Sequence, residues 1–402
     1  MKLSEELVYR GFRGQNTFKD ASELDERESK KFYFGADPSA NSLTIGNLAA
    51  IMMCACFVRH GYEPYLLVGG ATGQIGDPKD NGERELKPLE EVEANKVAIK
   101  KQLERLIRSD NLTMLDNLDW FRDVNYLDFL REVGKNFSMT QLLDRQFVEK
   151  RIGAGGSGIS YAEFSYTLIQ GYDFLHLYRE KGISLELCGE DQFGNCSSGI
   201  HLIRVLENAR ADAWSTPLVI DPITGRKFGK SEGNAVWLDA NLTSVFDFYQ
   251  FFLNQSDLAA PGLLKIYTVL EPEEIDRIIA EGQEAPEKRL VQKALARGAT
   301  AVVHGEELAN KVEELSNILF DKNTDFSTLQ LGELGELLTK TPCGKLVEIV
   351  TNSGLAESKK KAREYIAGGA ISVNGEKITD ENAEIVAGKI IKKGKNKFAL
   401  TV

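Results

Sequence analysis

Long hydrophobic runs are missing from this sequence, and no apolar stretch approaches the roughly 18 residues that span a bilayer. Residues 1–6 are acidic and amphipathic, and they lack the apolar segment of a secretory signal. Both absences argue against a membrane-spanning or secreted protein. We therefore expect a cytoplasmic protein that does not bind membranes.

Cysteine is scarce as well, with five residues scattered along the chain and no CxxC pair. An odd and dispersed set argues against a disulfide framework and against a structural zinc site, and we identify no metal site. Cys54 and Cys56 fall inside a helical pattern, where small buried side chains are the expected explanation.

Positive charge is in deficit, with 49 Lys and Arg against 60 Asp and Glu and a net charge of −11. A chain this acidic does not coat nucleic acids non-specifically. The deficit is uneven, because residues 340–402 hold 12 basic and 7 acidic residues, which gives +5 and leaves −16 elsewhere. This asymmetry predicts one module that contacts polyanions and another that does not.

The remaining composition, 42% hydrophobic and 27% charged, is that of an ordinary globular protein. A chain of 402 residues exceeds one typical core, which predicts two or three domains. We place domains at residues 1–240, 241–325 and 341–402. A linker is predicted at 326–340, because residues 321–342 mix Asp, Asn, Thr, Gly and Pro with short apolar patches.

A strand–helix–strand unit is predicted near the N-terminus. Residues 31–35 form an apolar strand, residues 48–58 follow helical spacing, and residues 65–68 form a second strand before a glycine turn at 69–73. This is the unit of a parallel nucleotide-binding sheet, so the expected fold class is α/β with a Rossmann-like sheet. Later segments predict strands at 183–188 and 217–220, a long amphipathic helix from Val92, and a mainly helical region from 243 to about 320.

The start of the first long helix, residues 43–48 (Leu-Thr-Ile-Gly-Asn-Leu), suits phosphate, since a helix N-terminus presents unpaired N–H groups. Gly46 allows close approach of a base, and Asn47 can hydrogen-bond a ribose or phosphate oxygen. Taken alone, a capped helix start is the more frequent explanation of such a segment.

A second segment, residues 225–233 (Gly-Arg-Lys-Phe-Gly-Lys-Ser-Glu-Gly), holds two lysines three apart on a glycine-flanked loop. Lys227 and Lys230 can swing onto a polyphosphate and neutralise the charge that grows as pyrophosphate leaves. A lone pair of this spacing is more often a solvated basic turn.

Together the two segments resemble the HIGH and KMSKS signatures of class I aminoacyl-tRNA synthetases. The surrounding sequence is similar, in order and over essentially the whole chain, to the bacterial tyrosyl-tRNA synthetase family; the matching stretches are residues 35–43, 68–73, 75–78, 166–174, 191–195 and 227–239.

The resemblance implies a tyrosine pocket. Tyr33 and Asp173 match the residues that hydrogen-bond the substrate phenol. Asp77, Tyr166 and Gln170 match the group that binds its ammonium, and Gln192 lies near its carboxylate. The chemistry agrees, since a phenol O–H needs an acceptor and a donor and an ammonium needs anions and dipoles.

The resemblance also implies an ATP site and a catalytic set. The ATP-binding positions are Asp37, Ser39, Thr44, Gly46, Asn47, Gly189, Asp191, Lys227 and Lys230, and the catalytic ones are Lys227, Lys230, Ser231, Thr44 and Asn47. Mg²⁺ is expected to arrive with ATP. Three residues depart from the family pattern: Thr44 and Asn47 replace the two signature histidines, and Glu190 replaces a small residue.

The C-terminal segment 358–376 predicts a serine-capped basic helix, a Gly-Gly stop and a strand that enters an Asn-Gly turn. It resembles the S4 RNA-binding domain, in which Lys359, Lys360, Lys361 and Arg363 would contact RNA. A solvated basic helix is the alternative. The domain roles expected from the resemblance are catalytic (1–240), helical and tRNA-contacting (241–325) and S4-like (341–402).

The expected function is activation of L-tyrosine with ATP, followed by transfer to the 3′-terminal adenosine of tRNA(Tyr). The resemblance also implies a homodimer, for which the apolar segment 120–143 is a candidate interface, although a core helix would look the same. Three alternatives remain: a synthetase for another aromatic amino acid, a small-molecule nucleotidyltransferase, and a catalytically idle RNA-binding protein.

Overall fold

The computed structural model describes all residues except 79–81, 83–84, 140–150, 153–155, 229, 232–233, 327 and 395. For Lys230, Ser231 and Asn234 it describes the backbone alone. The chain divides into two compact units, Met1–Ala235 and Val236–Val402, which are described separately.

The N-terminal unit is built on a five-stranded parallel sheet with the order β3-β2-β1-β4-β5. Its strands are β1 (Lys31–Ala36), β2 (Glu63–Val68), β3 (Thr113–Asp116), β4 (Leu185–Gly189) and β5 (Asp212–Thr216). The predicted Rossmann-like α/β class is confirmed. The strand order reverses between β1 and β4, and in open parallel sheets ligands bind beyond the carboxyl ends of the strands at such a point.

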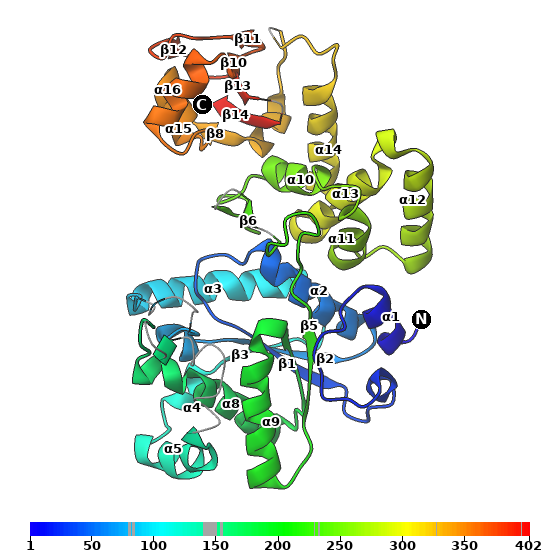
Figure 1. The fold of residues 1–402 in the computed structure, drawn as a ribbon, viewed down its shortest axis with the longest axis vertical. Coiled ribbons are helices and arrows are strands. Elements are labelled where there is room, and N and C mark those ends of the chain that lie inside the picture. Colours follow the sequence, from blue (N-terminus) through cyan, green and yellow to red (C-terminus); the bar gives the residue numbers. More distant parts are fainter. Residues whose placement is uncertain are drawn as a thin grey trace. The chain divides into compact units, whose positions relative to one another are not determined.

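Helices cover both faces of this sheet, with α2 and α3 on one side and α8 and α9 on the other (Figure 1). Among the described residues of the unit, the helices are α1 (Leu3–Tyr9), α2 (Ile45–Arg59), α3 (Leu89–Leu106), α4 (Leu118–Phe121), α5 (Tyr126–Glu132), α8 (Tyr161–Lys181) and α9 (Phe193–Glu207). Short 3₁₀ turns are η1 (Ala21–Leu24), η2 (Thr72–Gln74), η3 (Gly134–Asn136) and η4 (Glu190–Gln192), and β6 (Lys230–Ser231) pairs antiparallel with β7 (Asn234–Ala235).

One strand prediction was wrong. The structure has no strand at 217–219 and only an isolated bridge from Ile220 to Lys227, while the fifth strand is β5. This strand was not predicted because three of its five residues, Asp212, Ser215 and Thr216, are polar. Asp212 is buried because Arg27 pairs with it at 2.7 Å, and Ser215 Oγ donates to the Gln15 carbonyl at 2.8 Å. These partners come from a remote segment, so the local hydrophobic pattern gave no strand signal.

The C-terminal unit begins with the expected helical region. It contains α10 (Val245–Leu253), α11 (Ala260–Tyr267), α12 (Pro272–Glu284), α13 (Leu290–His304) and α14 (Glu306–Phe320), with η5 (Pro286–Lys288) before α13. Leu295, Ala296 and Ala299 on α13 are fully buried, which makes this helix the centre of the bundle.

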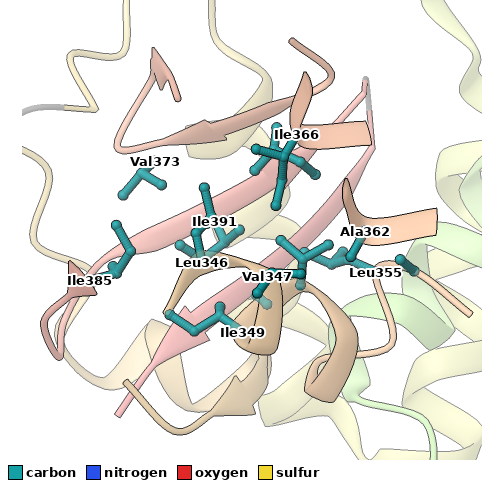
Figure 2. Packing of buried hydrophobic residues seen from close by; sticks show 13 residues of the cluster. Leu346, Val347, Ile349, Leu355, Ala362, Ile366, Val373, Ile385 and Ile391 are labelled. Atoms are coloured by element: carbon teal, nitrogen blue, oxygen red, sulfur yellow. The ribbon is translucent and has the colours of Figure 1, made fainter. Parts of the chain in front are cut away.

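A mixed sheet with the order β11-β10-β13-β14-β8 completes the unit. Its strands are β8 (Thr339–Thr341), β10 (Ile371–Val373), β11 (Glu376–Lys377), β13 (Ile390–Lys393) and β14 (Lys397–Thr401), beside the pair β9 (Gly344–Lys345) and β12 (Glu384–Ile385). Helices α15 (Leu346–Asn352) and α16 (Lys359–Ala367) pack against it, and Figure 2 shows Leu346, Ile366 and Ile391 converging in the shared core.

Two predictions for the segment 358–376 are confirmed. Ser358 accepts from the Lys361 N–H and caps α16, and Asn374 and Gly375 both have positive φ (45° and 86°), as the predicted Asn-Gly hairpin requires. Within residues 326–340, for which we expected a linker, lie η6 (Gly332–Leu337) and the start of β8, which pairs in parallel with β14.

Candidate active site

A cavity of about 440 Å³ opens at the carboxyl ends of β1 and β4, where the strand order reverses. Its lining includes fourteen of the residues singled out from the sequence: Tyr33, Asp37, Ser39, Thr44, Gly46, Asn47, Asp77, Tyr166, Gln170, Asp173, Gly189, Asp191, Gln192 and Lys227. The side chains of Lys230 and Ser231 lie outside the described part of the chain; their backbones form β6.

The closed end of the cavity holds Tyr33 and Asp173, each only 1% exposed. Asp173 accepts hydrogen bonds from Asn117 Nδ2 at 3.0 Å and from Trp120 Nε1 at 2.9 Å. Burial raises the pKa of Asp173, whereas these two donors favour its charged form. Burial likewise raises the pKa of Tyr33, so its hydroxyl keeps its proton and can donate it in a hydrogen bond.

A second carboxylate, Asp37, lies at the end of β1. Tyr166 Oη donates to Asp37 Oδ2 at 2.7 Å, and Thr72 Oγ1 donates to Asp37 Oδ1 at 2.7 Å. This packing needs glycine at position 69, because a Cβ there would lie 2.0 Å from Thr72 Oγ1 and 2.4 Å from Asp37 Oδ1. The predicted glycine turn after β2 therefore serves the placement of Asp37.

Asp77 forms a third anionic point. Gln192 Nε2 donates to Asp77 Oδ2 at 2.8 Å, and Asn195 Nδ2 contacts Asp77 Oδ1 at 3.3 Å and Gln192 Oε1 at 3.0 Å. Gln192 and Asn195 are neutral amides, so they orient the Asp77 carboxylate without adding charge of their own. Such a carboxylate is suited to a cationic ligand group.

The N-terminus of α2 forms the opposite wall. Asn47 Oδ1 accepts from the Thr44 N–H at 3.0 Å and from Thr44 Oγ1 at 2.9 Å. The two residues that replace the signature histidines thus bond to one another across the first helical turn, as in a capping box. Asn47 remains exposed, and its amide nitrogen can donate to a phosphate oxygen in the cavity.

The second signature segment reaches the same cavity. Phe228 is buried and its N–H donates to the Val219 carbonyl at 2.9 Å, which anchors the loop, while Lys227 is exposed on the cavity wall. Across the cavity, Gly189 ends β4 and Asp191 follows it; a Cβ at position 189 would lie 2.8 Å from Asp191 Oδ1.

All four basic residues predicted on α16 are exposed, and three of them are paired. Lys359 lies 3.5 Å from Glu348, Lys361 lies 2.6 Å from Glu364, and Arg363 lies 2.7 Å from Glu381. Exposed ion pairs are each worth less than about 1 kcal/mol, so phosphates can replace these carboxylates. The same unit contains a second cavity of about 430 Å³, lined by Phe326, Lys377 and Lys392 among others, which the sequence did not indicate.

Several residues that line the cavity or support its lining were missed. Asn117 and Trp120 lie in no matched stretch and bond to Asp173, 56 and 53 positions away. Thr72 lies in the matched stretch 68–73, but its bond to Asp37, 35 positions away, has no local signal. Glu186 did carry a signal: it is the single charged residue in the apolar strand β4. Within the described part of the chain, no helix is both long enough and apolar enough to cross a membrane.

Comparison with known proteins agrees with this geometry. Residues 25–321 match the family described as tRNA synthetases class I (W and Y), and residues 336–401 match the Tyrosine--tRNA ligase SYY-like C-terminal domain. The tyrosine–tRNA ligase of Levilactobacillus brevis is 39% identical, and that of Bacillus caldotenax 41%, each alignment covering 100% of this chain and 99% of the relative.

Solved structures give the same result. A C-terminally truncated mitochondrial tyrosyl-tRNA synthetase from Aspergillus nidulans superposes with a TM-score of 0.71 at 28% identity, covering 79% of this chain and 94% of that one. The tyrosyl-tRNA synthetase of Archaeoglobus fulgidus, at 14% identity and a TM-score of 0.58 over 77% and 99% of the two chains, shares the fold. The chain belongs to the class I tRNA synthetases of the tryptophan and tyrosine family.

Proposed function

We propose that this chain is a tyrosine–tRNA ligase, which activates L-tyrosine with ATP and transfers it to the 3′-terminal adenosine of tRNA(Tyr). The observation that carries the proposal is the buried pair Tyr33 and Asp173 at the closed end of the cavity. A phenol both donates and accepts a hydrogen bond, so it satisfies both partners, whereas an indole offers a donor alone and a phenyl ring offers neither. Leaving a buried polar group unsatisfied costs about 1–3 kcal/mol.

The first step requires no general base, because the tyrosine carboxylate is already ionised at neutral pH. It attacks the α-phosphorus of ATP in line and forms tyrosyl-adenylate as pyrophosphate leaves. Asp77, Tyr166 and Gln170 would hold the ammonium group, and Gln192 would lie beside the carboxylate. Catalysis then depends on positioning and charge stabilisation.

The nucleotide would lie against the N-terminus of α2 and the loop after β4. Thr44, Gly46 and Asn47 would face its phosphates, while Asp191 would accept from the ribose hydroxyls. Asp37, Ser39 and Gly189 complete this wall. ATP enters as its Mg²⁺ complex, and Lys227, Lys230 and Ser231 would meet the departing pyrophosphate.

In the second step a hydroxyl of the terminal adenosine of tRNA attacks the adenylate carbonyl, and AMP leaves as the bond from the carbonyl carbon to the phosphate oxygen breaks. Neither step asks for a catalytic histidine or cysteine. The exposed cations Lys359, Lys360, Lys361 and Arg363 on α16 would contact tRNA phosphates, consistent with the +5 charge of residues 340–402.

A homodimer is part of the proposal. Within the candidate segment 120–143, Val133 is buried and Phe129 packs on Tyr172, so one face belongs to the core. Tyr126 and Leu127 are 60% and 67% exposed on the other face, and Tyr126 Oη lies 3.3 Å from that of the exposed Tyr161. Such an aromatic and apolar patch suits a subunit interface. Residues 140–143 of this segment lie outside the described residues.

ATP–pyrophosphate exchange measured with each amino acid in turn tests the activity, followed by charging of tRNA(Tyr). We expect L-tyrosine alone to support exchange. Exchange driven by tryptophan would instead assign the other branch of the family, and exchange without tRNA charging would favour a small-molecule nucleotidyltransferase. A complete lack of exchange would identify an idle RNA-binding scaffold.

A further inference from the structure

Glu186 is a buried carboxyl group in the active-site cavity for which the steps above assign no task. It lies on β4, is 2% exposed, and lines the cavity beside Tyr33, its cross-strand partner on β1. The other β4 side chains, from two leucines and one cysteine, are apolar. Burying a carboxyl group in such surroundings costs free energy unless the group is paired or hydrogen-bonded.

The contacts of Glu186 are few and directional. Gln170 Nε2, from α8, donates to Glu186 Oε1 at 3.4 Å, and the Cys196 thiol from α9 also hydrogen-bonds to this carboxyl. Glu186 Oε2 and Gln170 Oε1 are both buried and, within the described part of the chain, have no hydrogen-bond partner. Glu186 Oε2 and Gln170 Oε1 can therefore each accept a hydrogen bond from a ligand in the cavity.

The contact decides which way the Gln170 amide faces. An ionised carboxylate can only accept, so it takes the NH₂ end of Gln170 and would repel the oxygen end. The Gln170 oxygen is therefore turned away from Glu186. A substrate ammonium group donates only, so it requires that oxygen and would be repelled by the NH₂ end of a reversed amide.

We propose that Glu186 is a positioning residue for substrate binding, which fixes the Gln170 amide so that its oxygen accepts from the ammonium group of tyrosine. This inference rests on the proposed function and adds a residue to the same site. The free Oε2 of Glu186 contributes a further negative charge to the same end of the cavity.

The arrangement makes substrate binding depend on pH. Burial raises the pKa of Glu186 to about 7, against hydrogen bonds from Cys196 and Gln170 that lower it. A protonated Glu186 becomes a donor, can bond to the Gln170 oxygen and releases the amide from its productive orientation. Tyrosine binding is therefore strongest above pH 7 and weakens as the pH falls through that value.

Other titratable groups lie around Glu186. They are Tyr33 on β1, Asp173 on α8, Cys196 on α9 and Cys188 on β4, with Asp37 at the end of β1. Burial raises the pKa of Tyr33 and of Cys196, so neither ionises near pH 7. Burial also raises the pKa of Asp173, and the Glu186→Gln variant separates its titration from that of Glu186.

The test measures KM for tyrosine by pyrophosphate exchange between about pH 6 and pH 8. For the natural sequence we expect KM to rise about tenfold towards pH 6 while kcat changes less than about twofold, since one group with a pKa near 7 controls binding. Glu186→Gln should raise KM at pH 8 by about tenfold, the value of one hydrogen bond to a charged group, and leave it flat across the range. Glu180→Gln, which removes an exposed carboxylate from α8, is the matched control and should behave as the natural sequence.

A second variant keeps the proposal testable if Glu186→Gln folds poorly. Gln170→Ala should abolish the pH dependence of KM although Glu186 is intact, and adding Glu186→Gln should change KM no further. A pH profile that survives in Gln170→Ala, additive effects, or unchanged KM in Glu186→Gln would overturn the inference. If the natural sequence gives no exchange with tyrosine at all, the proposed function itself fails.

Discussion

At the residue scale, Asp173 owes its orientation to donors that no motif contains. Trp120 Nε1 supplies one of its two hydrogen bonds, at 2.9 Å, while the indole ring stacks on His176 at 4.5 Å. In Trp120→Phe the stacking partner persists and the donor is removed. We expect KM for tyrosine to rise about tenfold, because a hydrogen bond to a charged group is worth about 1.5–3 kcal/mol.

Exchange kinetics at saturating ATP measure this effect. Trp237→Phe, a tryptophan change in the C-terminal unit, is the control and should leave KM unaltered. An unchanged KM in Trp120→Phe would mean that Asn117 alone holds Asp173 in place.

The lysines of the second signature segment have a different kinetic effect. Lys230→Ala should lower kcat of tyrosine activation by about 100- to 1000-fold, the usual loss for one group that stabilises transition-state charge. KM for tyrosine should stay within about twofold, since the lysine would act on the leaving group. Arg226→Ala, an exposed cation of the same loop, serves as control. Equal losses in kcat and tyrosine affinity would contradict the leaving-group role.

At the element scale, one carboxylate joins α1 to the end of α2. Glu6 contacts Arg10 Nε at 2.6 Å, Arg59 Nη2 at 2.6 Å and His60 Nε2 at 2.7 Å. Burial tends to raise the pKa of Glu6, but hydrogen bonds from His60 and Arg10 and the charge of Arg59 lower it to about 2. Glu6, Cys56 and His60 lie close enough together to resemble a set of metal ligands. However, Arg10 and Arg59 already neutralise the Glu6 carboxylate.

The lowered pKa of Glu6 fixes the sign of a pH effect. A carboxyl group with a depressed folded-state pKa stabilises the fold above its unfolded pKa of about 4.3, and this stability is lost as the pH falls towards 2. Glu6→Gln should therefore cost about 3 kcal/mol at pH 7, and the difference should shrink by pH 3. Urea unfolding at both pH values measures it.

Glu5→Gln is the matched control, since Glu5 is exposed on the same helix and glutamine can also bond to the Lys2 N–H. An equal loss of stability at pH 7 and pH 3 in Glu6→Gln would show that packing, and not charge, is at stake.

The elements also show what could be predicted from the sequence. β1, α2 and β2 were found because their apolar spacing and glycine turn are local signals. β5 was missed because its polar residues are buried against Arg27 and Gln15, which the chain brings together only in the fold. Residues 217–220 were predicted to form a strand because they are apolar. In the structure Leu218 and Ile220 are exposed instead of buried in the sheet, and Leu218 is on the cavity wall.

The same distinction holds within the candidate site. Residues 43–48 and 225–233 are contiguous and match a known family, so their side chains could be named in advance. Glu186 and Trp120 acquire their roles from hydrogen bonds across 16 and 53 positions of sequence. No pattern of periodicity or spacing contains such contacts.

At the scale of the whole molecule, residues 340–402 cannot be removed from the C-terminal unit without disturbing its helical region. Phe398 of β14 packs edge-on against Phe246 and Phe320 of the helical region, with ring centroids 5.7 and 5.6 Å apart. Deleting residues 340–402 would uncover these rings and break the pairing of β8 with β14. Such a truncation would impair tRNA charging for two reasons, because it removes the proposed RNA-binding surface and also damages the helical core. Point substitutions on the surface separate these two effects.

The variant Lys359→Gln, Lys360→Gln, Arg363→Gln removes three exposed cations from α16 and leaves its buried face, Ala362 and Ile366, intact. We expect pyrophosphate exchange to stay within about twofold, while KM for tRNA rises at least about tenfold. The salt dependence of tRNA binding should also weaken, by roughly 0.9 in log–log slope for each phosphate that the variant no longer neutralises, because fewer counterions are released.

The matched control removes three exposed cations from the N-terminal unit: Lys101, Arg105 and Arg108, on and just after α3. It changes the net charge by the same amount, so it separates a specific phosphate contact from a general weakening of attraction. If both triple variants weaken tRNA charging equally, net charge governs the association. If only the α16 variant does so and its salt slope falls, the three cations contact the phosphates themselves, and the basic C-terminal segment directs an otherwise acidic protein to RNA.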